Sequence, residues 1–344
     1  MRIAHLMLTR HFAGSERYAV ELANAQAERH EVAMLLPKAA QGDSPQTWAR
    51  HLDPRVQQIP LPNARWLQPW AARRALNAWQ PEVAHAHLSL GCKALGGWRA
   101  PKTLRVATLH IEYKPQQHAR LDALIAIAPW QLSALPALPT GLREHCEAIA
   151  NWSKARPSSP GARERQRQQW GVGPDEFLIG TLGRAEQSKG WEVLLQAFEQ
   201  AALPQARLVL VGQGRDWASL RKRAPQQVLM PGFTQAPQDC LAAFDLFVSA
   251  AHSEPFGLVF LEAMHAGLPI LATRTEGAQF LGREFLGRVP VGDAAALADA
   301  LRAAAAQRPA RRTYRMDDFE PDAQIARIEN FYQRERARLL AASA

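Results

Sequence analysis

Two glutamates, Glu254 and Glu262, are separated by seven residues in a segment that changes from a strand pattern to a helix pattern. Gly257 lies between them, after a buried apolar run, so Glu254 is expected in a loop and Glu262 on the following helix. Unpaired amides at a helix N-terminus suit phosphate or sugar oxygens, and Gly257 lets a ligand approach the backbone. The two carboxylates can therefore contact different parts of one elongated ligand. The simpler interpretation is an ordinary strand–helix unit with surface acids.

Two basic residues, Arg184 and Lys189, form a second candidate group. Gly180–Arg184 leads out of the end of a predicted strand, and Lys189 comes five residues after Arg184. Cations beyond the carboxyl end of a parallel strand can clamp a diphosphate, with the arginine as a planar fork and the lysine as a point charge. The alternative is a solvated loop with two ordinary surface charges.

The segment Glu254–Pro269, read Glu-Pro-Phe-Gly-Leu-Val-Phe-Leu-Glu-Ala-Met-His-Ala-Gly-Leu-Pro, closely resembles the signature of the retaining glycosyltransferases of family 4. These enzymes have the two-domain fold called GT-B. The resemblance implies that Glu254 faces the donor sugar and that Glu262 holds the ribose of the nucleotide. The backbone that it places against the sugar and the diphosphate is that of Phe256, Gly257 and Leu258.

The resemblance also assigns roles to other segments of the second half. The family has an arginine and a lysine at the spacing of Arg184 and Lys189, and both neutralise the leaving diphosphate. Val209–Gly214 is a strand that enters a Gly-rich turn, as in the family, and we interpret Gly212 and Gly214 as conformational. Phe233 lies in a segment that resembles the lining of the base pocket, and it either packs near the base or belongs to the core.

The first half resembles the family less sharply. Gly14 stands where the family often has a Gly-Gly pair, with Ala13 replacing the first glycine, and it would permit close approach of the donor phosphate or the acceptor. His110 resembles the strand-end histidine that reaches the donor sugar, the alternative being a satisfied histidine at a strand end. We interpret His85 as structural and leave the role of His87 open.

Short apolar runs that alternate with longer amphipathic runs must position these residues. Such runs are typical of strands buried on both faces of a parallel sheet, with helices between them. The predicted strands are Ile3–Leu8, Glu31–Leu36, Val83–His87, Val106–His110, Ala123–Ala128, Phe177–Leu182, Arg207–Val211, Asp245–Ser249 and Pro269–Thr273. The predicted helices include Glu16–Arg29, Trp191–Ala201 and Ala295–Ala305. The two blocks predict an α/β protein with two Rossmann-like domains, which the GT-B resemblance places face to face across a deep cleft.

The predicted domain boundary lies in a stretch rich in Pro, Ser, Gly, Arg and Gln, with Pro157–Gly161 at its centre. Residues 1–155 form the first domain, to which the resemblance gives the acceptor. Residues 156–318 form the second domain, to which it gives the nucleotide-sugar donor. A helix expected over residues 319–342 would pack back toward the first domain.

Composition excludes several classes of protein. The chain has 344 residues, a net charge of +9 and three cysteines without CxxC spacing. These numbers argue against a disulfide framework and a thiolate zinc site, and no targeting or membrane-spanning segment is recognisable. We therefore expect a cytoplasmic protein. No Asp-x-Asp motif or metal-ligand cluster stands out, so no metal or other cofactor is expected.

The surplus positive charge suggests an anionic partner. Residues 65–79 combine three tryptophans with three arginines, a composition that suits a helix lying on an anionic membrane surface, here the inner face of the cytoplasmic membrane. The alternative is a helix that uses Trp70 and Leu76 as core residues. A nucleic-acid partner is not expected, because no recognition motif accompanies the charge.

The leading hypothesis is a metal-independent, retaining glycosyltransferase that moves a sugar from a nucleotide-sugar, a UDP-sugar in the first instance, to a glycan or glycolipid such as a lipopolysaccharide core intermediate. The alternatives are a sugar-nucleotide epimerase or hydrolase of the same fold, or a non-catalytic binder of nucleotide-sugar or nucleic acid. Either Glu254 forms a covalent intermediate or the acceptor attacks on the face that the diphosphate leaves. We favour the second mechanism.

Overall fold

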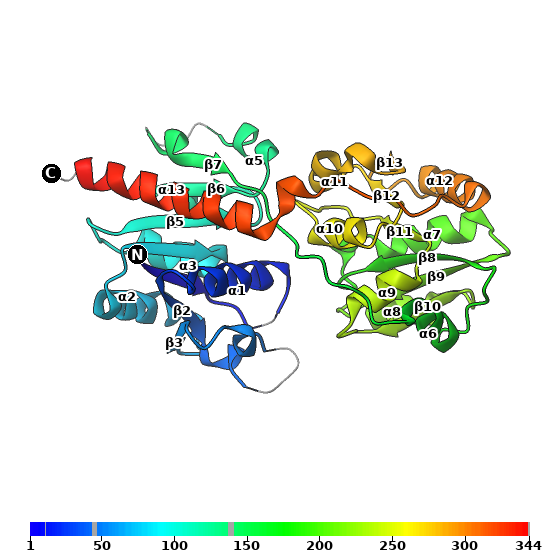
Figure 1. Ribbon diagram of the computed structural model, residues 1–344, viewed down its shortest axis with the longest axis horizontal. Helices are drawn as coiled ribbons and strands as arrows, with labels where there is room; N and C mark the ends of the chain where they lie inside the picture. Colours follow the sequence, from blue (N-terminus) through cyan, green and yellow to red (C-terminus); the bar gives the residue numbers. More distant parts are fainter. Residues whose placement is uncertain (11, 43–46, 137–140, 343–344) are drawn as a thin grey trace. The chain divides into compact units, whose positions relative to one another are not determined.

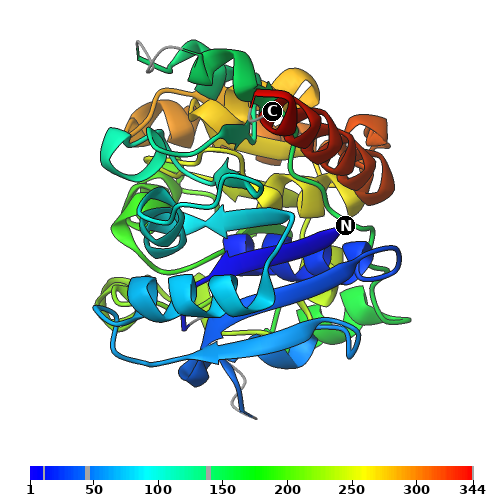
Figure 2. The ribbon, with the colours of Figure 1, turned by 90° about the vertical axis from the view of Figure 1, so that its left-hand side faces the viewer.

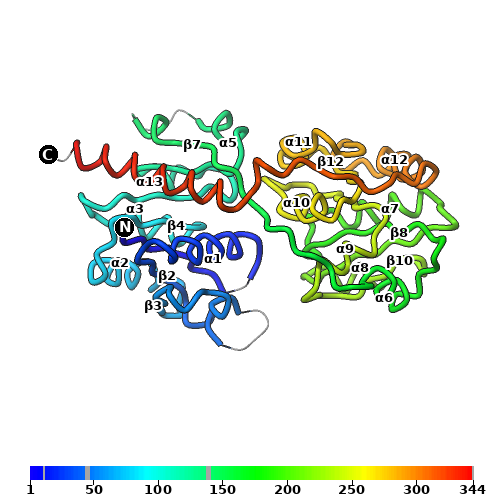
Figure 3. The backbone as a smooth tube through the Cα atoms, in the orientation of Figure 1, coloured from blue at the N-terminus to red at the C-terminus, as the bar shows by residue number. Residues whose placement is uncertain are grey.

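The computed structural model describes residues 1–10, 12–42, 47–136 and 141–342, which fold as two compact units (Figure 1). Unit 1 comprises Met1–Trp152 and Asp318–Ala344, and unit 2 comprises Ser153–Asp317. The predicted boundary after residue 155 lies a few residues beyond the observed one. Figure 3 follows the chain from unit 1 into unit 2 and back again into the long C-terminal helix, which belongs to unit 1.

Unit 1 is built on a sheet of seven parallel strands in the order β3-β2-β1-β4-β5-β6-β7. The inner strands β1, β4 and β5 are almost wholly buried, as expected for a sheet covered on both faces. The strands are β1 (Arg2–Met7), β2 (Glu31–Pro37), β3 (Gln57–Leu61), β4 (Val83–His87), β5 (Leu104–Leu109), β6 (Ala123–Ala126) and β7 (Cys146–Ala148).

Helices cover both faces of the unit 1 sheet. One face packs against α1 and α13, and the other packs against α2 and α3. Figure 2 shows α13, in red, running as a long helix beside the strands. The helices are α1 (Gly14–Gln26), α2 (Gln68–Trp79), α3 (Leu88–Gly96), α4 (Pro115–His118), α5 (Pro129–Ser133) and α13 (Pro321–Ala342).

Unit 2 is built on six parallel strands in the order β10-β9-β8-β11-β12-β13. Its core on one face is formed by α7 and α12, which pack on β8 and β9. The strands are β8 (Phe177–Leu182), β9 (Ala206–Val211), β10 (Val228–Gly232), β11 (Leu246–Ser249), β12 (Ile270–Thr273) and β13 (Gly287–Val289). The helices are α6 (Ala162–Gln169), α7 (Trp191–Ala201), α8 (Trp217–Arg223), α9 (Pro237–Ala243), α10 (Leu258–His265), α11 (Glu276–Leu281) and α12 (Ala294–Gln307).

Both sheets reverse their strand order at one point, between β1 and β4 in unit 1 and between β8 and β11 in unit 2. Loops that leave the carboxyl ends of such a strand pair diverge to opposite faces of the sheet and leave a crevice, which is where ligands bind in open α/β sheets. The parallel, two-sheet Rossmann-like architecture predicted from the sequence is confirmed.

Four strands, β3, β7, β10 and β13, were not predicted from the sequence. All four are edge strands of their sheets, and β7 and β13 are only three residues long. β3 contains Pro60 and is largely exposed, as is usual for an edge strand. Among the described residues, no helix is long and apolar enough to cross a membrane.

Candidate functional site

Glu254 lies in the loop between β11 and α10, at the carboxyl end of β11. Its side chain is 13% exposed, and its backbone carbonyl accepts a hydrogen bond from the amide of Gly277 at 2.8 Å. Gly257 is the residue before α10 and has φ +87°, a conformation that L side chains rarely adopt. A Cβ there would also collide with the ring of Phe260. The glycine therefore fixes how the loop of Glu254 enters the helix.

Lys189 is brought directly to Glu254. Its Nζ lies 2.6 Å from Oε2 of Glu254, and both side chains are largely buried. Lys189 ends a short 3-10 helix, Gln187–Lys189, in the loop that follows β8. The residue after it, Gly190, has φ +60°, and a Cβ there would overlap the carbonyl oxygen of Ala250. Lys189 therefore lies where its loop packs against the backbone at the end of β11.

Backbone hydrogen bonds join the two loops. The amide of His252 donates to the carbonyl of Ser188 at 2.9 Å, and the amide of Ser253 contacts the same oxygen at 3.4 Å. The loops follow β8 and β11, the strands at which the strand order of unit 2 reverses. The structure therefore places a cation and a carboxylate together at the topological switch point, where a phosphorylated ligand is expected in this fold.

Arg184, the second predicted clamp residue, has a different partner. Its Nη1 lies 3.0 Å from Oε1 of Glu186, and its side chain is 61% exposed. The described side chains therefore pair Lys189 with Glu254 and Arg184 with Glu186, so the two cations do not share a carboxylate. An exposed guanidinium whose nearest acid is only two residues away is screened by water and can exchange that partner for a phosphate at little cost.

The other residues of the signature divide between side-chain and backbone groups. Glu262 is half-buried on α10. Phe256 is 2% exposed and packs near the ring of Phe280, so only its backbone can meet a ligand. Leu258 is the first residue of α10, where backbone amides have no partner within the helix.

Phe233 follows β10 and is 64% exposed, so the alternative that it is a core aromatic is wrong. The glycines of the Gly-rich turn are packed against backbone. A Cβ on Gly212 would overlap the carbonyl oxygen of Gly183, and one on Gly214 would overlap that of Ala185. These glycines let the turn after β9 lie against the loop that carries Arg184, which agrees with a conformational role.

In unit 1, Gly14 is the first residue of α1 and follows the switch-point strand β1. Ala13, which replaces the family's glycine, has φ −144°, an extended conformation that any residue adopts. A buried carboxylate that was not predicted from the sequence holds this loop. Glu16 accepts hydrogen bonds from the hydroxyl of Thr9 at 2.6 Å and from the amide of Ala13 at 3.0 Å. The signal was an acid three residues after the N-cap.

His110 directly follows β5 and is only partly buried, whereas three other histidines of unit 1 are fully buried. His5, His85 and His87 are fully buried in unit 1, and their candidate ligand nitrogens lie within 4.8 Å of one another. Their proximity could not be predicted from the sequence, because His5 is on β1 and the other two are on β4. Parallel pairing places His5 beside His85, which puts all three on one face of the sheet.

Among the described residues, this is the one group of histidine, cysteine or acidic side chains whose potential ligand atoms converge as metal ligands would. Its nitrogens already have protein partners, namely Gln26, Tyr332, Thr108 and further histidines. A divalent cation would also enter an apolar core without a carboxylate to balance its charge, at a high desolvation cost. We interpret the cluster as hydrogen-bonded imidazoles.

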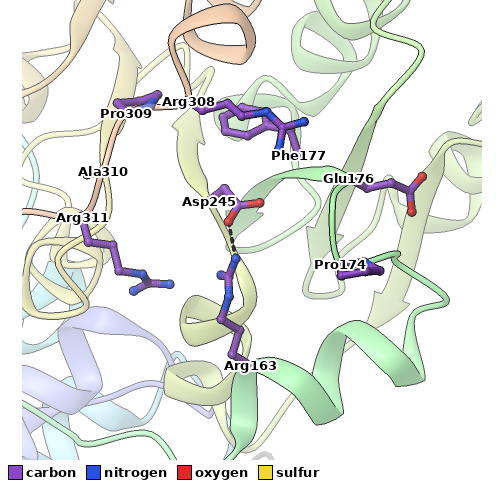
Figure 4. Close-up of a pocket in the computed structure, with 9 residues that line it drawn as sticks. All are labelled: Arg163, Pro174, Glu176, Phe177, Asp245, Arg308, Pro309, Ala310 and Arg311. Atoms are coloured by element: carbon purple, nitrogen blue, oxygen red, sulfur yellow. Dashed lines mark hydrogen bonds and ion pairs between the residues drawn. The ribbon is translucent and has the colours of Figure 1, made fainter.

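A cavity of about 250 Å³ opens at the amino-terminal edge of the unit 2 sheet, beside the first residues of β8 and β11 (Figure 4). Its charged side chains are engaged in holding the unit together. Arg163 pairs with Asp245 at 2.5 Å, and Arg311 donates to the carbonyls of Ala242 and Phe244 at 2.7 and 2.9 Å. No sequence-predicted site residue lines it, so we interpret it as structural.

Comparisons with known proteins match both units. A family model described as Glycosyltransferase Family 4 matches residues 12–138, and one described as Glycosyl transferases group 1 matches residues 176–307. The chain is 27% identical over 319 residues to the lipopolysaccharide core biosynthesis glycosyltransferase LpsD of Rhizobium meliloti, covering 88% of this chain and 87% of that protein.

Two solved structures have a similar fold. The structure of Anabaena Alr3699/HepE in complex with UDP and glucose aligns with a TM-score of 0.73 at 21% identity, covering 99% of this chain and all of that one. The structure of WaaG, a glycosyltransferase involved in lipopolysaccharide biosynthesis, aligns with a TM-score of 0.69 at 18% identity, covering 98% of each chain. At these identities the structural likeness shows the fold.

Proposed function

Because the chain belongs to the family 4 glycosyltransferases of GT-B fold, we propose that it transfers a sugar from a nucleotide-sugar to a glycan or glycolipid acceptor, with retention of the anomeric configuration and without a metal. The observation that carries the proposal is the contact of Lys189 with Glu254 at the switch point of unit 2, in front of α10. We assign the donor to unit 2 and the acceptor to unit 1.

The proposed donor is a UDP-sugar. The HepE structure, whose fold is similar, contains UDP and glucose, and this chain offers groups suited to each part of such a ligand. Glu262 can accept hydrogen bonds from ribose hydroxyls, and Phe233 presents an exposed ring on which a base can stack. The amides at the start of α10 suit the diphosphate.

In the proposed reaction the bond between the anomeric carbon and the diphosphate oxygen breaks, and its electron pair leaves with the diphosphate. Lys189, Arg184 and the N-terminus of α10 stabilise the negative charge that develops there. The acceptor oxygen attacks the anomeric carbon on the same face, and its proton passes to the leaving phosphate. Glu254 stabilises the cation-like sugar in this mechanism. In the alternative mechanism it forms a covalent intermediate.

A glycolipid acceptor would require the protein to reach a membrane surface. Trp66 and Trp70 are 80% and 59% exposed, and the guanidinium of Arg74 lies over the ring of Trp70. The alternative that Trp70 is a core residue is therefore wrong, whereas Leu76 is fully buried as that alternative required. We propose that these tryptophans and Arg74 make a peripheral contact with the anionic inner face of the cytoplasmic membrane.

Other members of the Trp/Arg segment serve the fold. Trp79 is buried beneath the guanidinium of Arg2, and its Nε1 donates to Gln57 at 2.8 Å. Arg73 donates to the backbone carbonyls of Ala94 and Lys93 at 3.0 and 3.1 Å. The proposed membrane contact therefore includes Trp66, Trp70 and Arg74 and not the whole of residues 65–79.

A panel of nucleotide-sugars tests the donor. UDP-glucose, UDP-galactose, UDP-N-acetylglucosamine and GDP-mannose are each added to the protein with and without EDTA, and the melting temperature is measured. A true donor raises it by mass action, to an extent set by its concentration relative to Kd. We expect a UDP-sugar to give the largest shift, unchanged by EDTA. A shift with GDP-mannose alone would overturn the assignment of the nucleotide.

The donor that binds is then incubated with lipopolysaccharide core acceptors, and the products are identified by mass spectrometry and by the NMR coupling of the new anomeric proton. Transfer with retained configuration supports the proposal. Conversion of the sugar-nucleotide without an acceptor, either to an epimer or to free sugar and UDP, would identify the epimerase or hydrolase instead. Inverted configuration would overturn the proposed mechanism.

A further inference from the structure

A row of imidazoles runs through the core of unit 1 and ends at His110. His5 on β1 pairs with His85 on β4, and His87 pairs with Thr108 on β5, two residues before His110. All of these side chains lie on the face of the sheet that packs against α1 and α13, among residues such as Ile3, Val83 and Ile328. Polar rings in so apolar a layer must satisfy one another's hydrogen bonds.

The first chain of hydrogen bonds includes three of the four histidines. Oε1 of Gln26, on α1, lies 2.8 Å from Nε2 of His5. Nδ1 of His5 lies 3.1 Å from Nε2 of His87, and Nδ1 of His87 lies 3.1 Å from Nε2 of His110. Each ring thus uses the same two nitrogens in the same order, from the amide in the core to the histidine at the end of the sheet.

The remaining histidine, His85, belongs to a second chain. Nδ1 of His85 lies 2.5 Å from the hydroxyl of Tyr332 on α13, and Nε2 of His85 lies 2.8 Å from the hydroxyl of Thr108. That hydroxyl lies 3.4 Å from the hydroxyl of Tyr18. His85 is as deeply buried as His5 and His87 but has no hydrogen bond to either. Tyr332 also hydrogen-bonds the side chain of Gln26, so the two chains meet at that residue while His85 itself stays outside the first chain.

Burial keeps all four rings uncharged at neutral pH. It lowers the pKa of His5 to about 4 and that of His110 to about 3, and it holds the pKa of His85 and of His87 well below the ordinary value. A neutral imidazole has one N–H donor and one acceptor nitrogen. In a chain of such rings, each link needs one donor, so all links must run in the same direction.

The amide of Gln26 sets that direction. Its oxygen faces His5 and can only accept, so Nε2 of His5 carries the proton. Nδ1 of His5 is then an acceptor, Nε2 of His87 its donor, and the same assignment follows at His110. The result is an Nε2–H tautomer of His110 whose Nδ1 is a free acceptor. In the described part of the chain, no protein group hydrogen-bonds to that nitrogen.

We propose that Gln26, His5 and His87 are positioning residues that hold His110 as an uncharged imidazole with Nδ1 presented as an acceptor for a ligand hydroxyl. The identity of that hydroxyl, as one of the donor sugar or the acceptor glycan, rests on the proposed function. The chain does not carry protons, since it ends on an amide oxygen, which takes up no proton at neutral pH. Its effect is selective: Nδ1 accepts from a hydroxyl and offers nothing to a phosphate or carbonyl oxygen.

The tautomer can be measured without any substrate. The full-length protein is labelled with ¹⁵N-histidine, and the signals of His110 are assigned by comparison with His110→Gln. Two-bond correlations between ring nitrogens and ring protons then show which nitrogen carries the proton. We expect Nε2–H at His110 in the wild type at pH 7. An Nδ1–H tautomer or an imidazolium at His110 would overturn the proposal.

The variant Gln26→Leu tests the chain three links away from His110. We expect it to produce a mixture of His110 tautomers and to lower kcat/KM by about ten- to hundredfold, the range that follows from one misdirected buried hydrogen bond. Thr108→Val is the matched control, because it removes a hydroxyl from the His85 chain, closer to His110 in sequence. It should leave the tautomer unchanged and kcat/KM within about threefold.

These readouts separate the inference from the proposed function. A pure Nε2–H tautomer in the wild type that Gln26→Leu disturbs supports the chain even if no sugar transfer is found, which would contradict the function alone. If Gln26→Leu and Thr108→Val had equal effects on the His110 tautomer and on activity, the hydrogen bonds from Gln26 to His110 would serve only the fold. That result would overturn the inference. Stoichiometric zinc in the purified protein, detected by mass spectrometry, would also overturn it, because a metal would displace these hydrogen bonds.

Discussion

The ammonium of Lys189 lies 2.6 Å from a carboxylate oxygen of Glu254, across two loops that follow β8 and β11. The residues are 65 positions apart in the sequence, and backbone hydrogen bonds from His252 and Ser253 to Ser188 keep the loops in register. A diphosphate that binds between them would take Lys189 as a partner and leave Glu254 nearer the sugar. The two residues are thereby expected to affect different steps.

Variants of this pair should separate binding from chemistry. Lys189→Met removes the cation, and we expect the Kd for UDP, measured by calorimetry, to rise about ten- to hundredfold, as for the loss of one charged hydrogen bond. Glu254→Gln keeps the shape and removes the charge. It should leave the Kd for UDP within about threefold and lower kcat by about a hundredfold or more, because the carboxylate acts on charge that develops in the transition state.

Another ion pair in unit 2, between Arg207 and Glu176, provides the control. Arg207 lies 2.8 Å from Glu176, with exposure similar to that of Lys189, but at the amino-terminal side of the sheet. Arg207→Gln should change neither the Kd for UDP nor kcat. If Glu254→Gln weakened UDP binding as strongly as Lys189→Met does, the assignment of Glu254 to the sugar would be contradicted.

The glycine after Lys189 should be intolerant of any side chain. Gly190→Ala both strains a positive φ and drives a Cβ into the carbonyl oxygen of Ala250. Gly171→Ala imposes the same kind of φ strain, at +64°, but its Cβ meets nothing within 4 Å. We expect Gly171→Ala to lower the free energy of unfolding by about 1 kcal/mol. Gly190→Ala should lower it by about 3 kcal/mol or more, since the backbone must also move.

The same two variants report on the site. Because Gly190 positions Lys189, Gly190→Ala should weaken UDP binding by at least about tenfold even when the protein remains folded, as judged by circular dichroism. Gly171→Ala should bind UDP normally. If the two variants had equal urea midpoints, the overlap with Ala250 would relax at no cost in stability. The contact with Ala250 would then not explain why position 190 is a glycine.

The inner strands and the signature segment were predictable from the sequence because their residues form continuous local patterns. β4, β8 and α7 have the predicted bounds, and Glu254 and Gly257 lie in the expected strand–loop–helix unit. What the sequence left open depended on distant neighbours. No local pattern shows that Lys189 faces Glu254, which lies 65 positions further along the chain.

The histidine cluster shows the same limit more clearly. His5 is on β1, His87 is on β4 and His110 directly follows β5, and only the parallel register of these strands brings the three to one face. Each histidine alone looks like a polar residue in or after a strand. The exposure of Trp70 was equally hidden, since an amphipathic helix with aromatic residues on two sides does not say which of them faces the sheet.

Acid should destabilise unit 1 well above the range in which carboxylates titrate. The pKa of His5 and of His110 is lowered in the folded state, to about 4 and about 3, whereas an unfolded histidine titrates near 6.5. As pH falls below 6.5 the unfolded chain takes up protons that the folded chain excludes. Stability is therefore retained above pH 6.5 and lost below it, by up to about 1.4 kcal/mol per pH unit for each such histidine.

Urea unfolding at pH 7.5, 6.0 and 5.0 measures this slope. His85→Phe removes one of the buried titrating groups, so its stability should fall less steeply between pH 6.0 and 5.0 than that of the wild type. A slope that His85→Phe leaves unaltered would mean that these rings do not stay neutral in the folded state.

Membrane contact through Trp66 and Trp70 should depend on both rings and on lipid charge. In vesicle flotation we expect the wild type to bind vesicles of phosphatidylglycerol and phosphatidylethanolamine and to be released by salt, because Arg74 contributes about 1 kcal/mol at an anionic surface. The double variant Trp66→Ser/Trp70→Ser should lose about 3 kcal/mol or more of transfer free energy, a loss of at least about a hundredfold in partitioning.

The control for that experiment is Val291→Ser, which removes an exposed apolar side chain, 43% accessible, from unit 2. It should partition as the wild type does, since the proposed contact is confined to unit 1. Binding that is equal on neutral phosphatidylcholine vesicles, or that survives the double tryptophan change, would contradict a contact at this surface. Because neither tryptophan belongs to the switch-point loops, the double variant should also keep its affinity for UDP, which separates membrane attachment from donor binding.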